Sequence, residues 1–283
     1  MERDSAGEKV MKFFAGIGWK KKAAAFFFVL LAGSVCAGEA VRIVSLSPSL
    51  TELVCHLGGK NCLVGRSSAC DHPAEIRSLP TAGDFARPDT EKLLSLRPDA
   101  VITCDLIVPA AANALARCGI KVLFLPCRSV SEYREACAAV GKLIGREGQA
   151  RAEMERIDSF VASCAKWKKL DRRILCLIWF KPPIAAGENT FLAELVALTG
   201  ARCCDLKGTK GYFKPSAEFL LGCGADTLLV FSDPVLCREH PVLRHTEAVK
   251  KGRVVHFSRS ELLQRPGPRF TEGVLQLRKA LEK

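Results

Sequence analysis

One long helical segment divides this chain into two parts. Residues 146–170 run for 25 positions without proline and with a single glycine, Gly148. The apolar positions of this stretch recur every three to four residues, as in an amphipathic helix: Ala150, Met154, Ile157, Val161, Cys164 and Trp167. At ~1.5 Å per residue such a helix extends for roughly 35 Å, the width of a small domain. We therefore expect it to connect two separate folding units.

Short apolar runs alternate with helical patterns on both sides of this segment. Before it, strands are predicted at 41–46, 63–65, 99–103 and 120–125, and helices at 53–57, 89–96, 108–118 and 131–144. After it, strands are predicted at 173–179, 227–231 and 253–257, and helices at 190–199, 216–221, 242–250 and 270–281. The alternation predicts an α/β fold with mainly parallel sheets. Ser49-Leu-Thr-Glu52 has the spacing of a capping box, which predicts that Ser49 caps the first helix.

One short pattern occurs once in each part of the chain. Residues 91–102 and 218–229 both read Glu-x-Leu-Leu, four residues, Asp, and then a hydrophobic strand, at an offset of 127 residues. This offset is longer than the period of any solenoid repeat. The echo predicts two lobes of similar construction joined by the long helix, and chance repetition is the alternative.

The first 37 residues have the three parts of a secretory signal. Three lysines at 20–22 precede an apolar run at 23–35, and Val35-Cys36-Ala37 places small residues before a cleavage point after Ala37. The apolar run is shorter than the ~20 residues that cross a bilayer. We predict that residues 1–37 are a signal peptide and that the protein is periplasmic. A buried core helix and a lipid anchor at Cys36 are the alternatives.

Composition and motifs exclude several classes of protein. The formal net charge is +12, but no basic tract is interleaved with aromatic residues, so we expect no nucleic-acid partner. The chain lacks a phosphate loop and the motifs GxGxxG, GxSxG and HExxH, and its five histidines are dispersed. We therefore predict no catalytic residues, no metal ligands and no cofactor.

Cysteine is the one reactive residue type that is abundant. Thirteen of the 14 cysteines follow residue 37, an odd number without a CxxC spacing, and many stand in apolar runs. Such cysteines are expected to be small buried hydrophobic side chains. An enzyme or redox sensor that uses Cys104 or Cys70 is the alternative function.

Six short motifs, in their order and spacing, carry a resemblance to a known family. They are residues 42–53 (RIVSLSPSLTEL), 71–73 (DHP), 94–102 (LSLRPDAVI), 119–122 (GIKV), 181–183 (KPP) and 265–269 (RPGPR). From about residue 42 to its end, the chain resembles periplasmic substrate-binding proteins of ABC importers, of the class that binds cobalamin, ferric siderophores or haem. The cobalamin-binding members are the most similar.

The resemblance implies two α/β lobes with a ligand cleft between them. The lobes would cover residues 42–130 and 171–283, with a helical segment at 131–170 that includes the long helix. It also implies a monomer that captures a metal chelate and delivers it to the permease dimer of an ABC importer. Any cobalt or iron would then belong to the ligand.

By the same resemblance, several residues fall at positions that line the ligand pocket. Phe85 and Tyr212 are the aromatic residues, Arg265 is the cation and Glu261 is a neighbouring acid. Cys104 stands where cobalamin binders have a large aromatic side chain. The alternatives are that the two aromatic residues only pack and that the arginine forms a surface ion pair.

The resemblance also implies a docking role for the echoed acids. Glu91 and Glu218 fall where the family has one glutamate on each lobe to meet arginines of the permease. The alternative is that both glutamates are solvated helix residues.

Two features of the cobalamin binders are missing from this chain. Ala69 stands where they have a second large aromatic residue, and their disulfide pair is absent.

Overall fold

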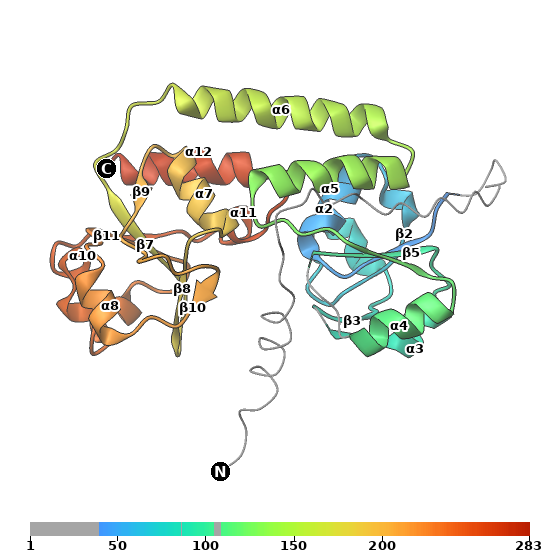
Figure 1. Cartoon of the computed structure of the whole chain (residues 1–283), viewed down its shortest axis with the longest axis horizontal. Helices are drawn as coiled ribbons and strands as arrows, with labels where there is room; N and C mark the ends of the chain where they lie inside the picture. The colour runs from blue at the N-terminus through green and yellow to red at the C-terminus, as the bar shows by residue number, and fades with distance from the viewer. Residues whose placement is uncertain (1–39, 86, 105–108) are drawn as a thin grey trace, which may run out of the picture. The chain divides into compact units, whose positions relative to one another are not determined.

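Two separate β-sheets form the framework of the protein in the computed structural model, which describes residues 40–85, 87–104 and 109–283 (Figure 1). The predicted signal peptide lies outside these residues. Within the described ranges, none of the helices is long and apolar enough to cross a bilayer. Each sheet and the helices that pack on it are called a lobe below, N-terminal or C-terminal.

The described strands of the N-terminal lobe form a parallel sheet in the order β2-β1-β5-β6. They are β1 (Ile43–Ser45), β2 (Leu63–Arg66), β5 (Ala100–Thr103) and β6 (Lys121–Phe124). The helices are α2 (Pro48–His56), α3 (Thr90–Ser95) and α4 (Pro109–Arg117), with 3-10 turns η1 (Lys60–Cys62) and η2 (Ala74–Ser78). A small antiparallel hairpin joins β3 (Gly83–Asp84) to β4 (Arg87–Pro88).

The sheet of the C-terminal lobe has the order β10-β8-β7-β11-β12, and β9 also pairs with β7. Strands β7 (Arg173–Phe180), β9 (Arg202–Cys203), β11 (Thr227–Val230) and β12 (Val254–His256) are parallel. Strands β8 (Pro183–Ala186) and β10 (Tyr212–Phe213) are antiparallel additions. The helices are α7 (Phe191–Leu198), α8 (Ala217–Gly222), α9 (Val235–Glu239), α10 (Glu247–Lys250), α11 (Glu261–Gln264) and α12 (Phe270–Leu281). The predicted α/β class with mainly parallel sheets is confirmed.

Two helices connect the lobes, α5 (Val130–Leu143) and α6 (Glu147–Ala165). Figure 1 shows α6 running alongside α5 and α12. Helix α6 has 19 residues and ends five residues before the predicted end. Beyond the helix, the Leu170 N–H donates to the carbonyl of Gly200 in the C-terminal lobe. The domain boundaries at 130 and 170 stay a prediction.

The side chains of each sheet alternate between two hydrophobic clusters. In the N-terminal lobe, Ile43 and Ile102 face a cluster that both lobes share, whereas Val44 and Val101 face a cluster of that lobe alone. In the C-terminal lobe the shared cluster takes Ile174 and Leu229, and the lobe's own cluster takes Leu175 and Leu228. This period of two is the ordinary consequence of strand geometry. The lobes are therefore joined by a continuous apolar core as well as by the chain.

Phe270 stands at the centre of the shared cluster. Its fully buried ring makes edge-to-face contacts with Tyr133 of α5, Phe160 of α6 and Phe191 of α7, at centroid distances of 5.9, 6.2 and 5.5 Å. Edge-to-face pairs of this kind add to the gain from burial. One side chain near the C-terminus thus joins the connecting helices to the C-terminal lobe.

Two local predictions are wrong. Helix α2 begins at Pro48 with Ser47 at the N-cap, so Ser49 does not cap it. Proline suits the first position of a helix because it has no N–H to leave unpaired. The predicted helix at 242–250 is interrupted, because Thr246 adopts an extended conformation (φ −68°, ψ 151°) between the turn η3 (Leu243–His245) and α10.

The echo in the sequence corresponds to equivalent positions in the two lobes. Glu91 and Glu218 are each the second residue of a six-residue helix, α3 and α8, and the strand that follows each helix lies next to β1 or β7. The aspartates of the echo also match. Asp99 accepts the backbone N–H of Arg42 (2.8 Å), and Asp226 accepts that of Arg173 (3.1 Å).

We expect Phe270→Ala to lower the free energy of unfolding by about 3–5 kcal/mol, because it removes the ring shared by four helices and leaves a cavity. Denaturant unfolding followed by circular dichroism measures the change. The matched control is Leu275→Ala on the same helix, where the side chain is exposed and the expected change is within about 0.5 kcal/mol. Equal effects of the two substitutions would contradict the central role of Phe270.

Candidate ligand-binding site

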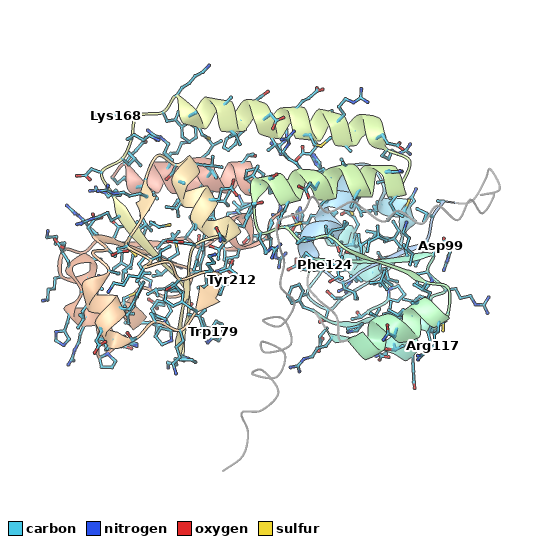
Figure 2. The ribbon with its side chains drawn as sticks, viewed as in Figure 1. Asp99, Arg117, Phe124, Lys168, Trp179 and Tyr212 are labelled. Carbon is cyan, nitrogen blue, oxygen red and sulfur yellow. The ribbon has the colours of Figure 1, made fainter. Side chains whose placement is uncertain are left out.

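Four aromatic side chains are exposed among the described residues, two on each lobe. They are Phe85 and Phe124 on the N-terminal lobe, at 43% and 44% exposure, and Trp179 and Tyr212 on the C-terminal lobe, at 58% and 52%. Figure 2 shows Tyr212 and Trp179 on the side of their lobe that is turned toward the N-terminal lobe, and Phe124 on the side turned toward them. Exposed aromatic rings are costly to leave in water, and a group of them marks a binding surface.

The C-terminal pair is held by strand geometry. Tyr212 and Phe213 form β10, so their side chains point to opposite faces. Phe213 packs edge-to-face on Phe219, with centroids 5.1 Å apart, and Tyr212 is left exposed. Trp179 lies near the end of β7, and its indole N–H donates to the carbonyl of Lys181 (3.1 Å). Strand geometry therefore sets the direction of Tyr212, and the hydrogen bond to Lys181 holds Trp179.

The N-terminal pair lies on a hairpin and on an edge strand. Phe85 follows β3 in the turn that leads to β4. Phe124 is the last residue of β6, which is the edge strand of its sheet. The carboxyl ends of parallel strands are where ligands of α/β folds gather. The placement of Phe124 agrees with that rule.

Trp179 and Phe124 are aromatic residues that the sequence analysis missed. Both stand at the ends of predicted strands, at 173–179 and 120–125. The signal that would have identified them is their position, because a large aromatic residue at the carboxyl end of a parallel strand has little sheet left to pack on. Phe85 and Tyr212, which the resemblance indicated, are exposed as a ligand contact requires.

Cys104 lies at the carboxyl end of β5. Its N–H donates to Oγ of Ser47 (2.9 Å), and the Ser49 Oγ lies 3.8 Å from its Sγ. The side chain is half-buried and stands at the same sheet edge as the start of α2. Cys70, in contrast, is fully buried, with the hydroxyls of Thr51 and Ser67 at 3.1 and 3.2 Å from its Sγ. Its burial separates it from any ligand.

Arg265 forms an ion pair between the lobes. Its Nη1 donates to Oδ1 of Asp71 (2.5 Å) and lies 3.6 Å from Oε1 of Glu52. Arg269, four residues later, binds Glu52 through two nitrogens, both at 2.8 Å. Arg265 is thus engaged by carboxylates of the N-terminal lobe, and it is 26% exposed. An anionic group that binds Arg265 would compete with Asp71 for its terminal nitrogens.

The hydrogen bond from Arg265 lowers the pKa of the Asp71 carboxyl below its usual value of 3.8. The Asp71 side chain is 46% exposed, so water screens this interaction and keeps its contribution modest. The buried Glu52, in contrast, has only 3% of its side chain exposed and is held by both arginines.

Glu261 contacts two arginines and keeps 29% of its side chain exposed. It is the first residue of α11, and its Oε1 lies 3.4 Å from Nε of Arg259 and 3.9 Å from Nη1 of Arg269. Because Arg269 also binds Glu52, Glu261 belongs to the same charge network as Arg265. The structure therefore brings Glu261 and Arg265 together in one network.

Glu91 and Glu218 are both exposed on the surfaces of their lobes. The helices that carry them are capped by side chains, since Asp89 accepts the N–H of Lys92 (3.1 Å) and Ser216 that of Phe219 (3.1 Å). A cap fixes the direction of a short helix. The two acids therefore have equivalent local settings.

A cavity of about 640 Å³ opens where α5 and α7 begin, and its lining residues are Arg128, Ser129, Glu132, Asn189, Thr190, Ala193 and Glu194. Its charged groups are already engaged, because Arg128 pairs with Glu132 (2.6 Å) and Glu194 accepts the N–H of Val130 (2.8 Å). The volume is within the range of small-molecule sites. None of the predicted site residues lines it. We take the four exposed aromatic residues, with Arg265, as the candidate site.

A family of known proteins matches most of the chain. The family described as periplasmic binding protein matches residues 43–260. Among curated proteins, the uncharacterized ABC transporter substrate-binding lipoprotein YvrC of Bacillus subtilis (strain 168) is 27% identical over 256 residues, which cover 86% of this chain and 80% of that protein. A cobalamin-binding protein of Halobacterium salinarum is 24% identical over 257 residues, covering 86% and 69%.

Solved structures show the same fold. A periplasmic heme-binding protein from Roseiflexus sp. RS-1, in its apo form, superposes with a TM-score of 0.76 at 22% identity, over 86% of this chain and 98% of that one. At this identity the likeness concerns the arrangement of the lobes, and the residues that contact a ligand are not carried over by it.

The lowered pKa of Asp71 predicts a pH dependence of stability. The ion pair contributes fully above the usual carboxyl value of 3.8 and is lost as the pH falls through the lowered value of the folded state. We therefore expect Asp71→Asn to reduce stability at pH 6–7, with the difference from the parent shrinking toward zero in acid. Denaturant unfolding of both proteins, from pH 7 into the acid range, measures this difference in stability.

The control for this prediction is the Arg265→Gln background. There Asp71→Asn should leave little pH-dependent difference, because the partner that lowers the carboxyl pKa is gone. A difference that stays the same in acid, or that persists without the arginine, would show that Asp71 acts through other contacts.

Proposed function

Because the chain belongs to the periplasmic binding protein family, we propose that it is an exported substrate-binding protein that captures a metal chelate and delivers it to an ABC importer. The chelates in question are cobalamin, a ferric siderophore and haem. The relatives support this class, since one is described as a cobalamin-binding protein and a structural neighbour as heme-binding. The predicted signal peptide and the lipoprotein relative support export.

One observation carries the proposal, which is the pair of exposed aromatic residues on each lobe. Planar macrocycles such as corrin and porphyrin bind by stacking on aromatic faces, and a ring on each side would enclose them. Phe85 and Phe124 would supply one side, and Trp179 and Tyr212 the other. The two added aromatic residues compensate in number for Ala69 and Cys104, where cobalamin binders have larger side chains.

Arg265 gives the site its electrostatic preference. A guanidinium keeps its charge at every physiological pH and matches a carboxylate with two hydrogen bonds. In the free protein this position is taken by Asp71. A chelate that carries carboxylates, as a haem or many siderophores do, would replace Asp71 and leave Arg265 paired. The geometry thus favours an anionic chelate.

We propose a non-enzymatic role on the basis of the same residues. A binding protein needs shape and charge, and the candidate site supplies aromatic faces and an arginine. The alternative, a redox or chelate-processing enzyme that uses Cys104 or Cys70, requires a reactive group in contact with ligand. Cys70 is fully buried, and Cys104 is the remaining candidate.

Ultraviolet–visible spectroscopy distinguishes these functions directly. The purified protein is titrated separately with cobalamin, haemin and a ferric siderophore. We expect stoichiometric binding of one of them and recovery of the ligand unchanged after denaturation. Recovery of a chemically altered ligand would favour the enzyme, and failure to bind any of the three would overturn the proposed chelate class.

The aromatic residues provide a quantitative test of the site. We expect Phe85→Ala with Tyr212→Ala to raise the dissociation constant of the bound chelate by ~30-fold or more, which corresponds to about 2 kcal/mol. Both side chains are exposed, so the protein should remain folded. Isothermal titration calorimetry measures the constant, with Leu275→Ala as the control. A change of less than about twofold would remove these residues from the site.

The echoed glutamates support a second part of the proposal, docking to the permease. Glu91 and Glu218 are exposed at equivalent positions on the two lobes, so a permease dimer could meet each with one of its subunits. Complementary charge mainly sets orientation and encounter rate. The pair should therefore affect transport rather than ligand capture, and a monomeric binding protein suffices for this arrangement.

We expect Glu91→Lys with Glu218→Lys to leave the ligand dissociation constant nearly unchanged and to abolish stimulation of the permease ATPase in liposomes. The reason is that two favourable contacts become repulsive ones. In the parent protein, stimulation should weaken as salt is added, because salt screens exposed charges.

The matched control is Glu135→Lys with Glu155→Lys, which changes the net charge equally at exposed positions on α5 and α6. This control should stimulate the ATPase like the parent protein. Normal stimulation by the first double variant, or equal loss in both, would contradict docking through the echoed glutamates.

A further inference from the structure

Two buried cysteines meet beneath the helix that carries Glu218. Cys204 follows β9 directly, and Cys223 is the C-cap residue of α8. They are 5% and 1% exposed and belong to the same hydrophobic cluster, that of the C-terminal lobe alone. The Asp205 N–H donates to the carbonyl of Cys223 (3.0 Å), so the two stretches of backbone lie side by side.

The two thiols are also close enough to affect each other's ionisation. The interaction with Cys204 lowers the pKa of the Cys223 thiol to about 7, and the same interaction raises the pKa of Cys204. In the folded protein the two thiols therefore interact with each other directly.

We propose that Cys204 and Cys223 form a disulfide bond in the exported protein. The inference rests on the proposed function in one respect, which is that export brings the chain to a compartment where disulfides persist. It assigns a covalent modification to two of the thirteen described cysteines, which are present as free thiols in this structure.

The neighbouring cysteines point elsewhere. Cys203 precedes Cys204 in the chain, and its Sγ lies 4.0 Å from the carbonyl of Ala193 in α7. Adjacent residues of an extended chain direct their side chains to opposite sides. Cys176 is buried within β7, one of the strands of the shared cluster. The pairing of Cys204 with Cys223 is therefore the one that the backbone arrangement favours.

The chemistry needs an external oxidant. Two thiols lose two electrons and two protons as the S–S bond forms, and a low-molecular-weight or enzymatic disulfide accepts them and is reduced to two thiols. The Cys223 thiolate attacks the oxidant's disulfide to give a mixed disulfide, and the Cys204 sulfur then displaces the reduced half. Because both side chains are buried in the folded protein, the exchange takes place while the chain folds.

The bond would anchor the helix that carries one of the proposed docking acids. Helix α8 has six residues, and a helix of this length is not stable by itself. Its start is capped by Ser216, and the disulfide would tie its end to β9. Oxidation would therefore hold Glu218 in place. The equivalent helix α3 has no cysteine in its six residues or at its C-cap, Leu96.

The test begins with the purified full chain, reduced, denatured and refolded in a glutathione and glutathione disulfide buffer. Remaining thiols are then blocked under denaturing conditions and the peptides are mapped by mass spectrometry. Cleavage after Glu218 and Asp226 separates Cys223 from Cys237. We expect this peptide to be joined to the one that holds Cys203 and Cys204. The mass of the joined pair should be lower by two hydrogen atoms than the sum of the two reduced peptides.

Variants assign the bond and measure its effect. Cys203→Ala should retain the cross-link, whereas Cys204→Ala and Cys223→Ala should each abolish it. The oxidised parent protein should melt on the order of 5–10 °C above the reduced one, with slower hydrogen exchange in α8, and both differences should vanish in the last two variants. Fragmentation of the joined peptides between Cys203 and Cys204 assigns the bond in the parent itself, so a variant that does not fold leaves the test intact.

An absent Cys204–Cys223 cross-link in the refolded parent, or a bond to Cys203 instead, would overturn the proposal. These results leave the proposed transport function untouched, because refolding does not depend on export or on a ligand. If the cross-link forms on refolding but is missing from protein isolated from cells with its N-terminal segment intact, the pairing is supported and export is contradicted.

Discussion

A single buried carboxylate ties the start of the described chain to its end. Glu52 on α2 has 3% of its side chain exposed and is gripped by Arg269 through two hydrogen bonds, with Arg265 at 3.6 Å. A carboxylate so far from water is tolerated only when it is fully paired, and removing a partner would leave an uncompensated charge. The position of Arg265, and with it the electrostatic character of the candidate site, depends on this arrangement. Asp71 and Glu261 then complete the network from the two sides.

The apolar core supports the same connection. The cluster that both lobes share takes one face of each sheet and is centred on Phe270, while each lobe keeps a second cluster of its own. The exposed aromatic residues lie outside these clusters, in or at the ends of strands and in a hairpin. The candidate ligand contacts therefore lie at the margins of two sheets. The family relationship, the fold and the candidate site all agree with a substrate-binding protein.

The order of strands and helices could be predicted from the sequence because it depends on local apolar patterns, and the echo predicted the equivalence of Glu91 and Glu218. Other features depend on distant contacts. Glu52 has the spacing of a capping residue, but its carboxylate accepts a hydrogen bond from Arg269, which is 217 residues away in the sequence. Helix α6 ends at Ala165, and Leu170 within the predicted helix bonds instead to Gly200. The exposure of Trp179 and Phe124 follows from where strands end and which strand lies at the edge, and neither is visible in a pattern of residue types.

The shared cluster has a consequence for the kinetics of capture and release. Swinging the lobes apart would bring buried rings such as Phe270 and its neighbours into water, so wide opening is costly for the protein alone. Complex formation then needs little reorganisation, and a molecule can be held without spending its own interaction energy on closing the lobes. The same stiffness slows escape. Release then requires interactions from outside the protein that offset the cost of exposing these rings.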